Sequence, residues 1–216
     1  SSFILFTNGI WQGTVTITKS GTTAITVTYQ NKAGTSNGFY VSPAQLDYFT
    51  FATITTQIVA KPFQITITAY DGYGNIADYT GKAELNSPKG IYPQTTTPFL
   101  DGIWKGTVTI GYVGTTTITA NAGTKTGTSP AFVVVPSELL NIVISPSMAT
   151  ITVDAMVEFT AYGYDALWNE IKLVGGRWAV TPNIGTLAKL EGPTNTFIAG
   201  TKAGSGLITL ATNSSS

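Results

Sequence analysis

A nine-residue string occurs twice in this chain and limits the folds open to it. "GIWQGTVTI" spans residues 9–17, and "GIWKGTVTI" spans residues 102–110. No catalytic motif requires a string to recur 93 positions later, whereas a duplicated structural unit does. The same offset relates further pairs of residues: Gly21 with Gly114, Ile25 with Ile118, Gly34 with Gly127, Phe39 with Phe132 and Pro43 with Pro136. We infer that the chain is built from repeated modules.

A second correspondence joins the middle of the chain to its end. "AYDGYGN" at 69–75 aligns with "GYDALWN" at 163–169, at an offset of 94. The period of about 93 residues is near the roughly 100 residues of a seven-strand immunoglobulin-like sandwich. Residues 44–136 are expected to form one complete module. Residues 1–43 match only the last part of a module, and residues 137–216 match a module without its final strand, so we expect strands from the same polypeptide or a neighbouring copy to complete them.

Short segments of strict alternation predict half-buried β-strands. In "TVTIT" at 14–18, "AITVT" at 24–28 and "QITIT" at 64–68, apolar residues face one side and threonines the other. Asn8-Gly9 and Asp101-Gly102 are dipeptides that tolerate the positive φ of tight hairpins. No long segment shows the spacing of an amphipathic helix. The expected fold class is all-β, with tandem immunoglobulin-like antiparallel β-sandwich modules.

The alternation also predicts which side chains are buried. In the second copy of the repeated string, Val108 and Ile110 are expected in the core, and Thr107 and Thr109 on the surface. Trp178 lies among apolar residues and is expected to be a core tryptophan. The strands of the complete module are expected at 46–52, 57–70 (with a break near Pro62), 82–86, 97–100, 104–110, 115–121 and 128–135.

Composition excludes several classes of function. The 216 residues include no cysteine and no histidine, which removes thiolate metal sites and the commonest general base. Eleven basic residues balance eleven acidic ones, so no nucleic-acid partner is expected. Apolar runs such as "AFVVV" at 131–135 are far shorter than the roughly 20 residues of a membrane span. With 38 threonines and 10% charged residues, the sequence favours an extracellular β-protein. The glycosylation sequon at Asn213 lies near the chain end and decides little.

The combined pattern "GIWxGTVTI…GTTxITxxxG…GTSxxFxVxP", then "FxITxxAYDxYGN", resembles bacterial immunoglobulin-like repeats of the invasin type. The resemblance covers essentially the whole chain, although the third unit carries "GRWAV" at 176–180 in place of the GIWxG string. Repeats of this type occur in cell-surface adhesins, S-layer proteins and secreted polysaccharide-active proteins. The resemblance therefore implies an extracellular location at the cell surface or cell wall.

Trp11 and Trp104 each begin a strand after a hairpin turn, and two interpretations are open. An exposed indole face can stack on a pyranose ring, which makes both residues candidates for glycan binding. Alternatively, each ring plugs one end of a sandwich, and recurrence in register favours this structural role.

Asp71 with Asn75, and Asp165 with Asn169, share one spacing in one aligned loop. Their oxygens make these four residues a candidate calcium site. However, calcium normally takes six to eight oxygen ligands, and Asp and Asn also cap their own turns. We therefore expect no required cofactor and leave Ca²⁺ binding as an alternative.

No enzymatic activity is expected. The carboxylate pairs Asp71 with Asp78 and Asp165 with Glu170 leave glycoside hydrolysis as the only catalytic alternative in a chain without histidine. The favoured function is a non-catalytic structural segment of a cell-surface or S-layer repeat protein, whose partners are neighbouring modules. The alternatives are an adhesin or carbohydrate-binding module that contacts surface glycans, and a spacer in a secreted polysaccharide-active enzyme.

Overall fold

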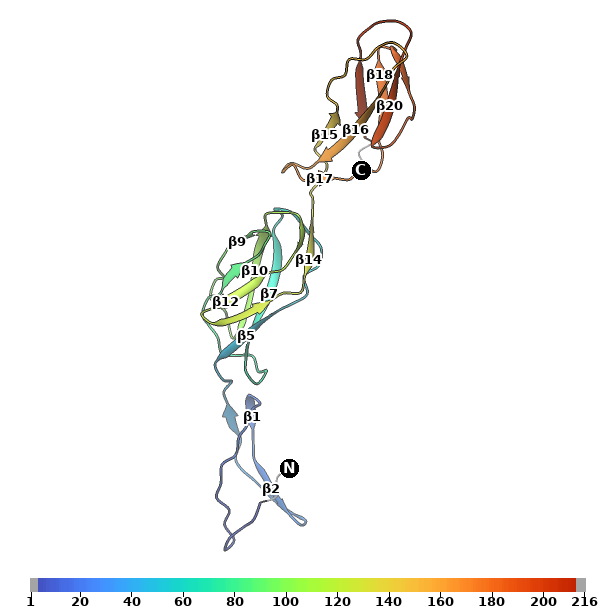
Figure 1. Cartoon of the computed structure of the whole chain (residues 1–216). Coiled ribbons are helices and arrows are strands. Elements are labelled where there is room, and N and C mark those ends of the chain that lie inside the picture. Colours follow the sequence, from blue (N-terminus) through green and yellow to red (C-terminus); the bar gives the residue numbers. More distant parts are fainter. Residues whose placement is uncertain (1–3, 213–216) are drawn as a thin grey trace. The chain divides into compact units, whose positions relative to one another are not determined.

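The computed structural model describes residues 4–212 and divides the chain into two compact units, Ser1–Val133 and Val134–Ser216. All regular secondary structure in this part of the chain is β, in 21 strands coloured by sequence position in Figure 1. Among these residues no helix is long and apolar enough to cross a membrane. The sequon at Asn213 lies outside the described residues.

The division into units only partly follows the expected modules. The boundary after Val133 lies close to the seam expected at Pro136, whereas the seam expected at Pro43 falls inside the first unit. The three-part division into 1–43, 44–136 and 137–216, and the module length of about 93 residues, therefore stay predictions.

Residues 4–43 contribute four short strands to the first unit. β1 (Gly21–Thr23) pairs with β4 (Phe39–Val41), and β2 (Thr26–Tyr29) forms a hairpin with β3 (Lys32–Thr35). None of the described residues from 4 to 43 is buried. This segment therefore has β-strands but no core of its own.

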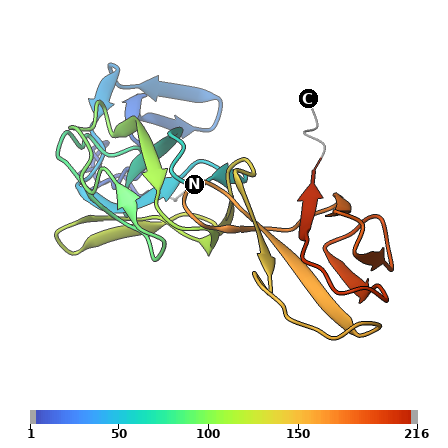
Figure 2. The same cartoon turned by 90° about the horizontal axis from the view of Figure 1, so that it is seen from above.

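The rest of the first unit is a β-sandwich, visible from two directions in Figures 1 and 2. One sheet has the order β5-β7-β10-β9, with antiparallel pairings. The other strands form two three-stranded sheets, β11-β14-β6 and β13-β12-β8. The strands are β5 (Leu46–Phe51), β6 (Gln57–Ile58), β7 (Phe63–Asp71), β8 (Glu84–Asn86), β9 (Ile91–Tyr92), β10 (Ile103–Ile110), β11 (Gly114–Thr116), β12 (Thr119–Ala122), β13 (Lys125–Thr128) and β14 (Phe132–Val135). We call this part the central sandwich; β14 crosses the boundary between the units.

The core of the central sandwich follows the predicted alternation. In β10, Val108 and Ile110 are buried, Thr107 is exposed and Thr109 is partly exposed, which confirms the predicted register. The same period in β7 buries Ile65 and Ile67. The buried residues of the other strands in this core include Leu85, Ile118, Phe132 and Val134.

The turns that precede the two copies of the repeated string also match the prediction. Asn8 and Gly9 have φ values of 50° and 77°, and Asp101 and Gly102 have values of 49° and 75°. Positive φ at both central residues defines the type I′ hairpin turn, which suits the twist of the flanking strands. A side chain at Gly102 would also meet the carbonyl oxygen of Ala77.

The second unit contains two groups of paired strands. One is the sheet β15-β16-β20-β19, with β17 also paired to β16, and the other is the pair β18-β21. Their core contains Phe159, Ala161, Leu173, Trp178 and Phe197, so the prediction that Trp178 is a core residue is confirmed. The strands are β15 (Asn141–Ser145), β16 (Met156–Tyr164), β17 (Glu170–Ile171), β18 (Arg177–Thr181), β19 (Gly185–Leu187), β20 (Thr194–Ala199) and β21 (Leu207–Ala211).

The expected strands of the central module differ from the structure in four places. One is the segment 115–121, which was expected as one strand and is divided into β11 and β12. Residues 97–100 form no strand, although Leu100 makes an isolated bridge to Ile103 across the hairpin turn. β9 was not expected. The segment expected as one strand at 128–135 is instead β13 followed by β14, because Ser129-Pro130 interrupts the extended backbone. The fold class itself, an all-β antiparallel sandwich, is confirmed.

Candidate functional site: two buried aspartate junctions

Each aligned loop buries a carboxylate. Asp71 is the last residue of β7, and Asp165 directly follows β16. Both side chains have an exposed fraction of 0%, which is unusual because carboxylates are rarely buried unless they are paired. The groups that bind these two carboxylates therefore explain why the sequence places aspartates here.

Four N–H donors surround the carboxylate of Asp71. Its Oδ1 accepts hydrogen bonds from the backbone N–H groups of Tyr73 at 2.9 Å and Asn75 at 2.8 Å. Its Oδ2 accepts from the side-chain Nδ2 of Asn75 and the backbone N–H of Ala44, both at 2.9 Å. Since Ala44 directly follows Pro43, Asp71 ties the segment that enters the module to the loop after β7. We call this set the Asp71 junction.

The Asp165 junction repeats this arrangement in the second unit. Its Oδ1 accepts from the backbone N–H groups of Leu167 and Asn169, both at 2.9 Å. Its Oδ2 accepts from Nδ2 of Asn169 and from the backbone N–H of Ser137, both at 3.0 Å. Ser137 directly follows Pro136, so this carboxylate also binds the residue after a seam proline.

The loop geometry requires the four-residue spacing of aspartate and asparagine. The N–H of Asp71 donates to the carbonyl of Asn75 at 2.9 Å, and the N–H of Asp165 donates to the carbonyl of Asn169 at 3.0 Å. The residue before each asparagine has a positive φ, 78° at Gly74 and 61° at Trp168. A bulky residue seldom adopts this conformation. Trp168 is 64% exposed, and its ring centroid lies 5.5 Å from that of Tyr164.

Asn75 extends the Asp71 junction to the N-terminal segment. Its Nδ2 donates to the carbonyl oxygen of Thr18 at 2.8 Å, and its Oδ1 accepts from the N–H of Ser20 at 2.9 Å. One amide thus pairs with the backbone of residues 18–20 while it also binds the carboxylate of Asp71. Because the amide is 4% exposed, water competes weakly for these bonds.

The hydrogen bonds keep both carboxylates ionised. Burial alone raises the pKa of Asp71, but the bonds from the side chain of Asn75 and from the backbone N–H groups of Ala44, Asn75 and Tyr73 outweigh it and lower the pKa to about 2. The same opposition lowers the pKa of Asp165 to about 2, with the side chain of Asn169 as the largest favourable contribution. Both groups are therefore anions at neutral pH.

The candidate calcium ligands occupy these junctions. Calcium binds oxygen atoms, whereas the carboxylate oxygens of Asp71 accept from N–H groups and those of Asp165 accept from N–H groups and the hydroxyl of Ser137. Across residues 4–212, no group of three or more acidic, histidine or cysteine side chains is placed to hold a metal ion. Calcium binding at Asp71, Asn75, Asp165 and Asn169 stays a prediction, and the observed bonds give these residues a different role.

The two candidate glycan-binding tryptophans differ in exposure. Trp104 is 4% exposed, and its Nε1 donates to Thr97 Oγ1 at 2.9 Å, so its ring is buried and held by a hydrogen bond. Trp11 is 36% exposed. Both rings lie over the glycine two positions later, since a side chain at Gly13 or Gly106 would meet the indole. This contact explains the W-x-G spacing of the repeated string, and glycan stacking requires a more exposed face than Trp104 offers.

Sequence analysis missed Ala44 and Ser137. Ala44 contributes only a backbone N–H, which places no requirement on its side chain. Ser137 contributes its backbone N–H at 3.0 Å and, at 3.4 Å, its hydroxyl. The indirect signal was available, because each follows a proline at a seam and each lies 27 or 28 positions before its aspartate.

No protein-family model matches the chain, and no curated protein matches it. Solved structures do match. FdeC, an adhesin of Escherichia coli, is 17% identical; the match covers 91% of this chain and 70% of FdeC with a TM-score of 0.50. Domains 4–9 of surface layer protein SbsC are 20% identical over 89% of this chain and 33% of that one, with a TM-score of 0.34. Invasin, a bacterial integrin-binding protein, is 14% identical over 75% and 35%, with a TM-score of 0.39.

These comparisons bear on the fold. The likeness to FdeC confirms, as a fold, the resemblance to bacterial immunoglobulin-like repeats that the sequence pattern suggested. The chain spans about a third of the length of the SbsC and invasin structures.

Proposed function

We propose that this chain is a non-catalytic structural segment of an extracellular tandem-repeat protein, part of a stalk or S-layer array at the cell surface. The observation that carries the proposal is the recurrence of one buried junction 94 residues apart. Each time, the aspartate holds the residue after a seam proline. Fixing the chain where it enters a module limits bending there, which suits a string of modules that must keep a spacing.

The state of the two aspartates supports a non-catalytic role. A general acid must be protonated near the working pH, whereas the pKa of both carboxylates is lowered to about 2. A nucleophilic carboxylate needs a free oxygen, and every oxygen of Asp71 and Asp165 accepts two or more hydrogen bonds. Their sequence partners Asp78 and Glu170 are exposed.

The location rests on composition and on the analogy with FdeC, which is an adhesin. Antibodies raised against the chain test it on intact cells that produce the protein. We expect labelling without permeabilisation and loss of labelling after external protease. Labelling that requires permeabilisation would contradict the proposed extracellular location. Hydrolysis of cell-wall polysaccharide by the immunopurified full-length polypeptide favours the alternative of a spacer in a secreted enzyme.

Glycan binding at Trp11 is a second candidate function, because this ring is partly exposed while its repeat counterpart is buried. A glycan array probed with the chain tests it. Binding that disappears in Trp11→Ala but persists in Tyr29→Ala, which removes another exposed aromatic ring, supports this function. A glycan array without any signal would contradict glycan binding as a function of this chain.

A further inference from the structure

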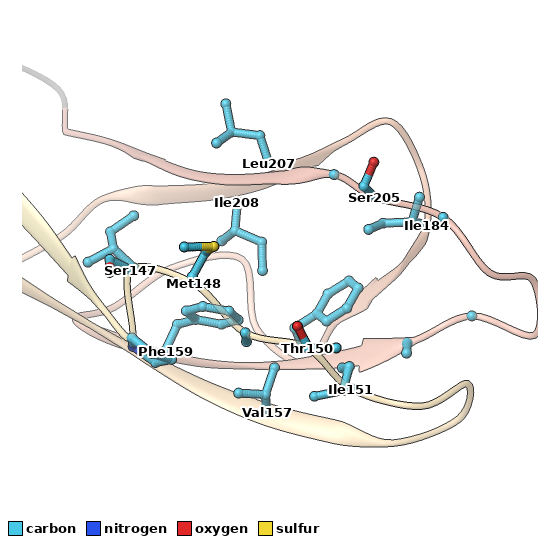
Figure 3. Close-up of a pocket in the computed structure, with 18 of the residues that line it drawn as sticks. Ser147, Met148, Thr150, Ile151, Val157, Phe159, Ile184, Ser205, Leu207 and Ile208 are labelled. Atoms are coloured by element: carbon cyan, nitrogen blue, oxygen red, sulfur yellow. The ribbon is translucent and has the colours of Figure 1, made fainter.

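An apolar groove of about 1020 Å³ opens in the second unit. Figure 3 shows Val157 and Phe159 of β16 toward one side, Leu207 and Ile208 of β21 toward the other, and Thr150 between them. Lys202 is the only charged residue among those that line it. The size is at the upper end of the roughly 300–1,000 Å³ found for small-molecule sites.

The internal repeat identifies what this groove corresponds to. Ala120 of β12 pairs with Leu85, and Leu210 of β21 pairs with Trp178, which is the repeat counterpart of Leu85. β21 is therefore the counterpart of β12, and residues 204–206 are the counterpart of β11. In the same way, residues 151–152 are the counterpart of β6 at an offset of 94.

In the central sandwich, β14 lies between β11 and β6. Their counterparts, residues 204–206 and 151–152, both line the groove, and neither segment belongs to a strand in the described part of the second unit. The groove therefore lies at the position that β14 takes in the central sandwich.

Burial of matching residues supports this assignment independently. Ile118 and Ile110 have exposed fractions of 0% in the central sandwich. Their counterparts by strand register, Ile208 and Ala199, are only partly buried and line the groove. Phe63 packs on Phe132 of β14 with ring centroids 6.1 Å apart, and its counterpart Val157 also faces the groove. The Phe63–Phe132 contact and the lower exposure of Ile118 and Ile110 are thus consistent with a groove at the position of β14.

We propose that this groove accepts one extended polypeptide strand with the sequence pattern of β14, inserted between residues 151–152 and 204–206. Residues 151–152 and 204–206 lie outside the described strands, and the carbonyl of Thr152 accepts a turn hydrogen bond from the N–H of Ala155. An added strand can pair with backbone N–H and C=O groups on both sides of the groove, which favours a strand over a compact ligand. The apolar floor requires apolar residues at alternate positions. In β14 these are Phe132 and Val134, which are 4% and 1% exposed, whereas Val133 between them is 43% exposed.

A peptide that copies residues 124–136 tests the proposal against the whole 216-residue chain. We expect saturable binding in fluorescence anisotropy, slower amide exchange at residues 150–153 and 203–208, and a higher melting temperature for the second unit. Lysine in the peptide at the inward positions, Phe132→Lys with Val134→Lys, should weaken binding at least about tenfold, because a charge would be buried. Lysine at the outward position, Val133→Lys, should leave binding within about twofold.

A peptide with poor solubility is replaced by a fusion that carries the same thirteen residues after Ser216 through a flexible linker. Its second unit should melt higher than that of the fusion with the inward lysines. Three results overturn the proposal: protection elsewhere than the groove, equal binding of the inward and outward lysine peptides, or groove protection that appears on dimerisation of the chain without peptide. An apolar dye that fills the groove and is not displaced by the peptide overturns it as well.

Discussion

At Asp71 and Asp165 a buried negative charge is balanced by N–H groups. A carboxylate that accepts four hydrogen bonds can replace its hydration shell, so burial carries a small net cost. The bonds also connect segments that lie far apart in sequence, since Ala44 is 27 positions before Asp71. The aspartate acts as a connector because its two oxygens face different parts of the chain.

Replacing Asp71 by asparagine tests this connecting role. The amide keeps the shape of the side chain but turns one acceptor into a donor, which then faces N–H groups. We expect faster hydrogen exchange at the Ala44 amide and a lower melting temperature of the first unit. Asp78→Asn, an exposed site in the same loop, is the control and should change neither value. Unchanged exchange at Ala44 in Asp71→Asn contradicts the assignment.

The pH dependence of stability follows from the lowered pKa values. In the unfolded chain an aspartate has a pKa near its ordinary value of 3.8, and in the folded chain the pKa of Asp71 and Asp165 is about 2. A lowered folded pKa gives stability that is fully present above pH 4 and is lost as pH falls toward 2. We expect the melting temperature to be constant from pH 7 to 5 and to fall between pH 4 and 2. The double variant Asp71→Asn, Asp165→Asn should have a lower melting temperature at pH 7 and a smaller fall of melting temperature between pH 4 and 2. An equal fall in the variant and the unaltered chain would contradict the assignment of the pH dependence to these two aspartates.

At the scale of single elements, β10 shows how alternation and a repeated string combine. Period two in "TVTI" predicted the faces of Val108 and Ile110 correctly, because one side of the strand must pack against the other sheet. The W-x-G spacing was visible as a repeat, but its cause, the indole lying over Gly106, depends on a rotamer that the sequence does not specify.

Core truncation in β10 should be costly and surface change should not. Ile110 is completely buried, so Ile110→Ala is expected to lower the free energy of unfolding by roughly 2–5 kcal/mol. Thr109→Ser on the opposite face should stay within about ±0.5 kcal/mol. Urea melts measure both values. The reverse ranking would place the register off by one residue.

Filling the space under Trp104 should also destabilise the central sandwich. Gly106→Ala places a methyl group against the indole, and we expect a loss of about 1–3 kcal/mol from overpacking. Gly111→Ala is the matched control, because its new methyl group would meet only the carbonyl oxygen of Lys89 at 3.5 Å, an ordinary contact. Equal stability of the two variants in urea melts would show that the ring moves aside freely.

At the scale of the whole molecule, the repeat predicted the type of module better than its pairings. Alternation and turn dipeptides were sufficient for an all-β sandwich. β9 is only two residues long, Ile91–Tyr92, and pairs at the end of β10, so no local pattern distinguishes it from a loop. The roles of Ala44 and Ser137 depend on long-range backbone hydrogen bonds, which no local sequence pattern predicts.

The last prediction concerns which part of the chain folds independently. Residues 44–136 contain the strands of the central sandwich, the donor N–H of Ala44 and the buried residues of its core. Residues 4–43 contain paired strands but no buried side chain, and isolated hairpins without an apolar contact surface are marginal in water.

We therefore expect residues 44–136 alone to unfold cooperatively as a monomer and residues 1–43 alone to give the poorly dispersed NMR spectrum of an unfolded chain. Removing residues 1–43 from residues 44–136 exposes the side-chain amide of Asn75 to water. Because water can replace its hydrogen bonds to Thr18 and Ser20, the free energy of unfolding of the fragment should be only modestly lower. Asn75→Ala should consequently destabilise the whole chain more than the 44–136 fragment, because only the whole chain contains residues 18–20. Cooperative folding of residues 1–43 alone, or equal effects of Asn75→Ala in both backgrounds, would contradict this division.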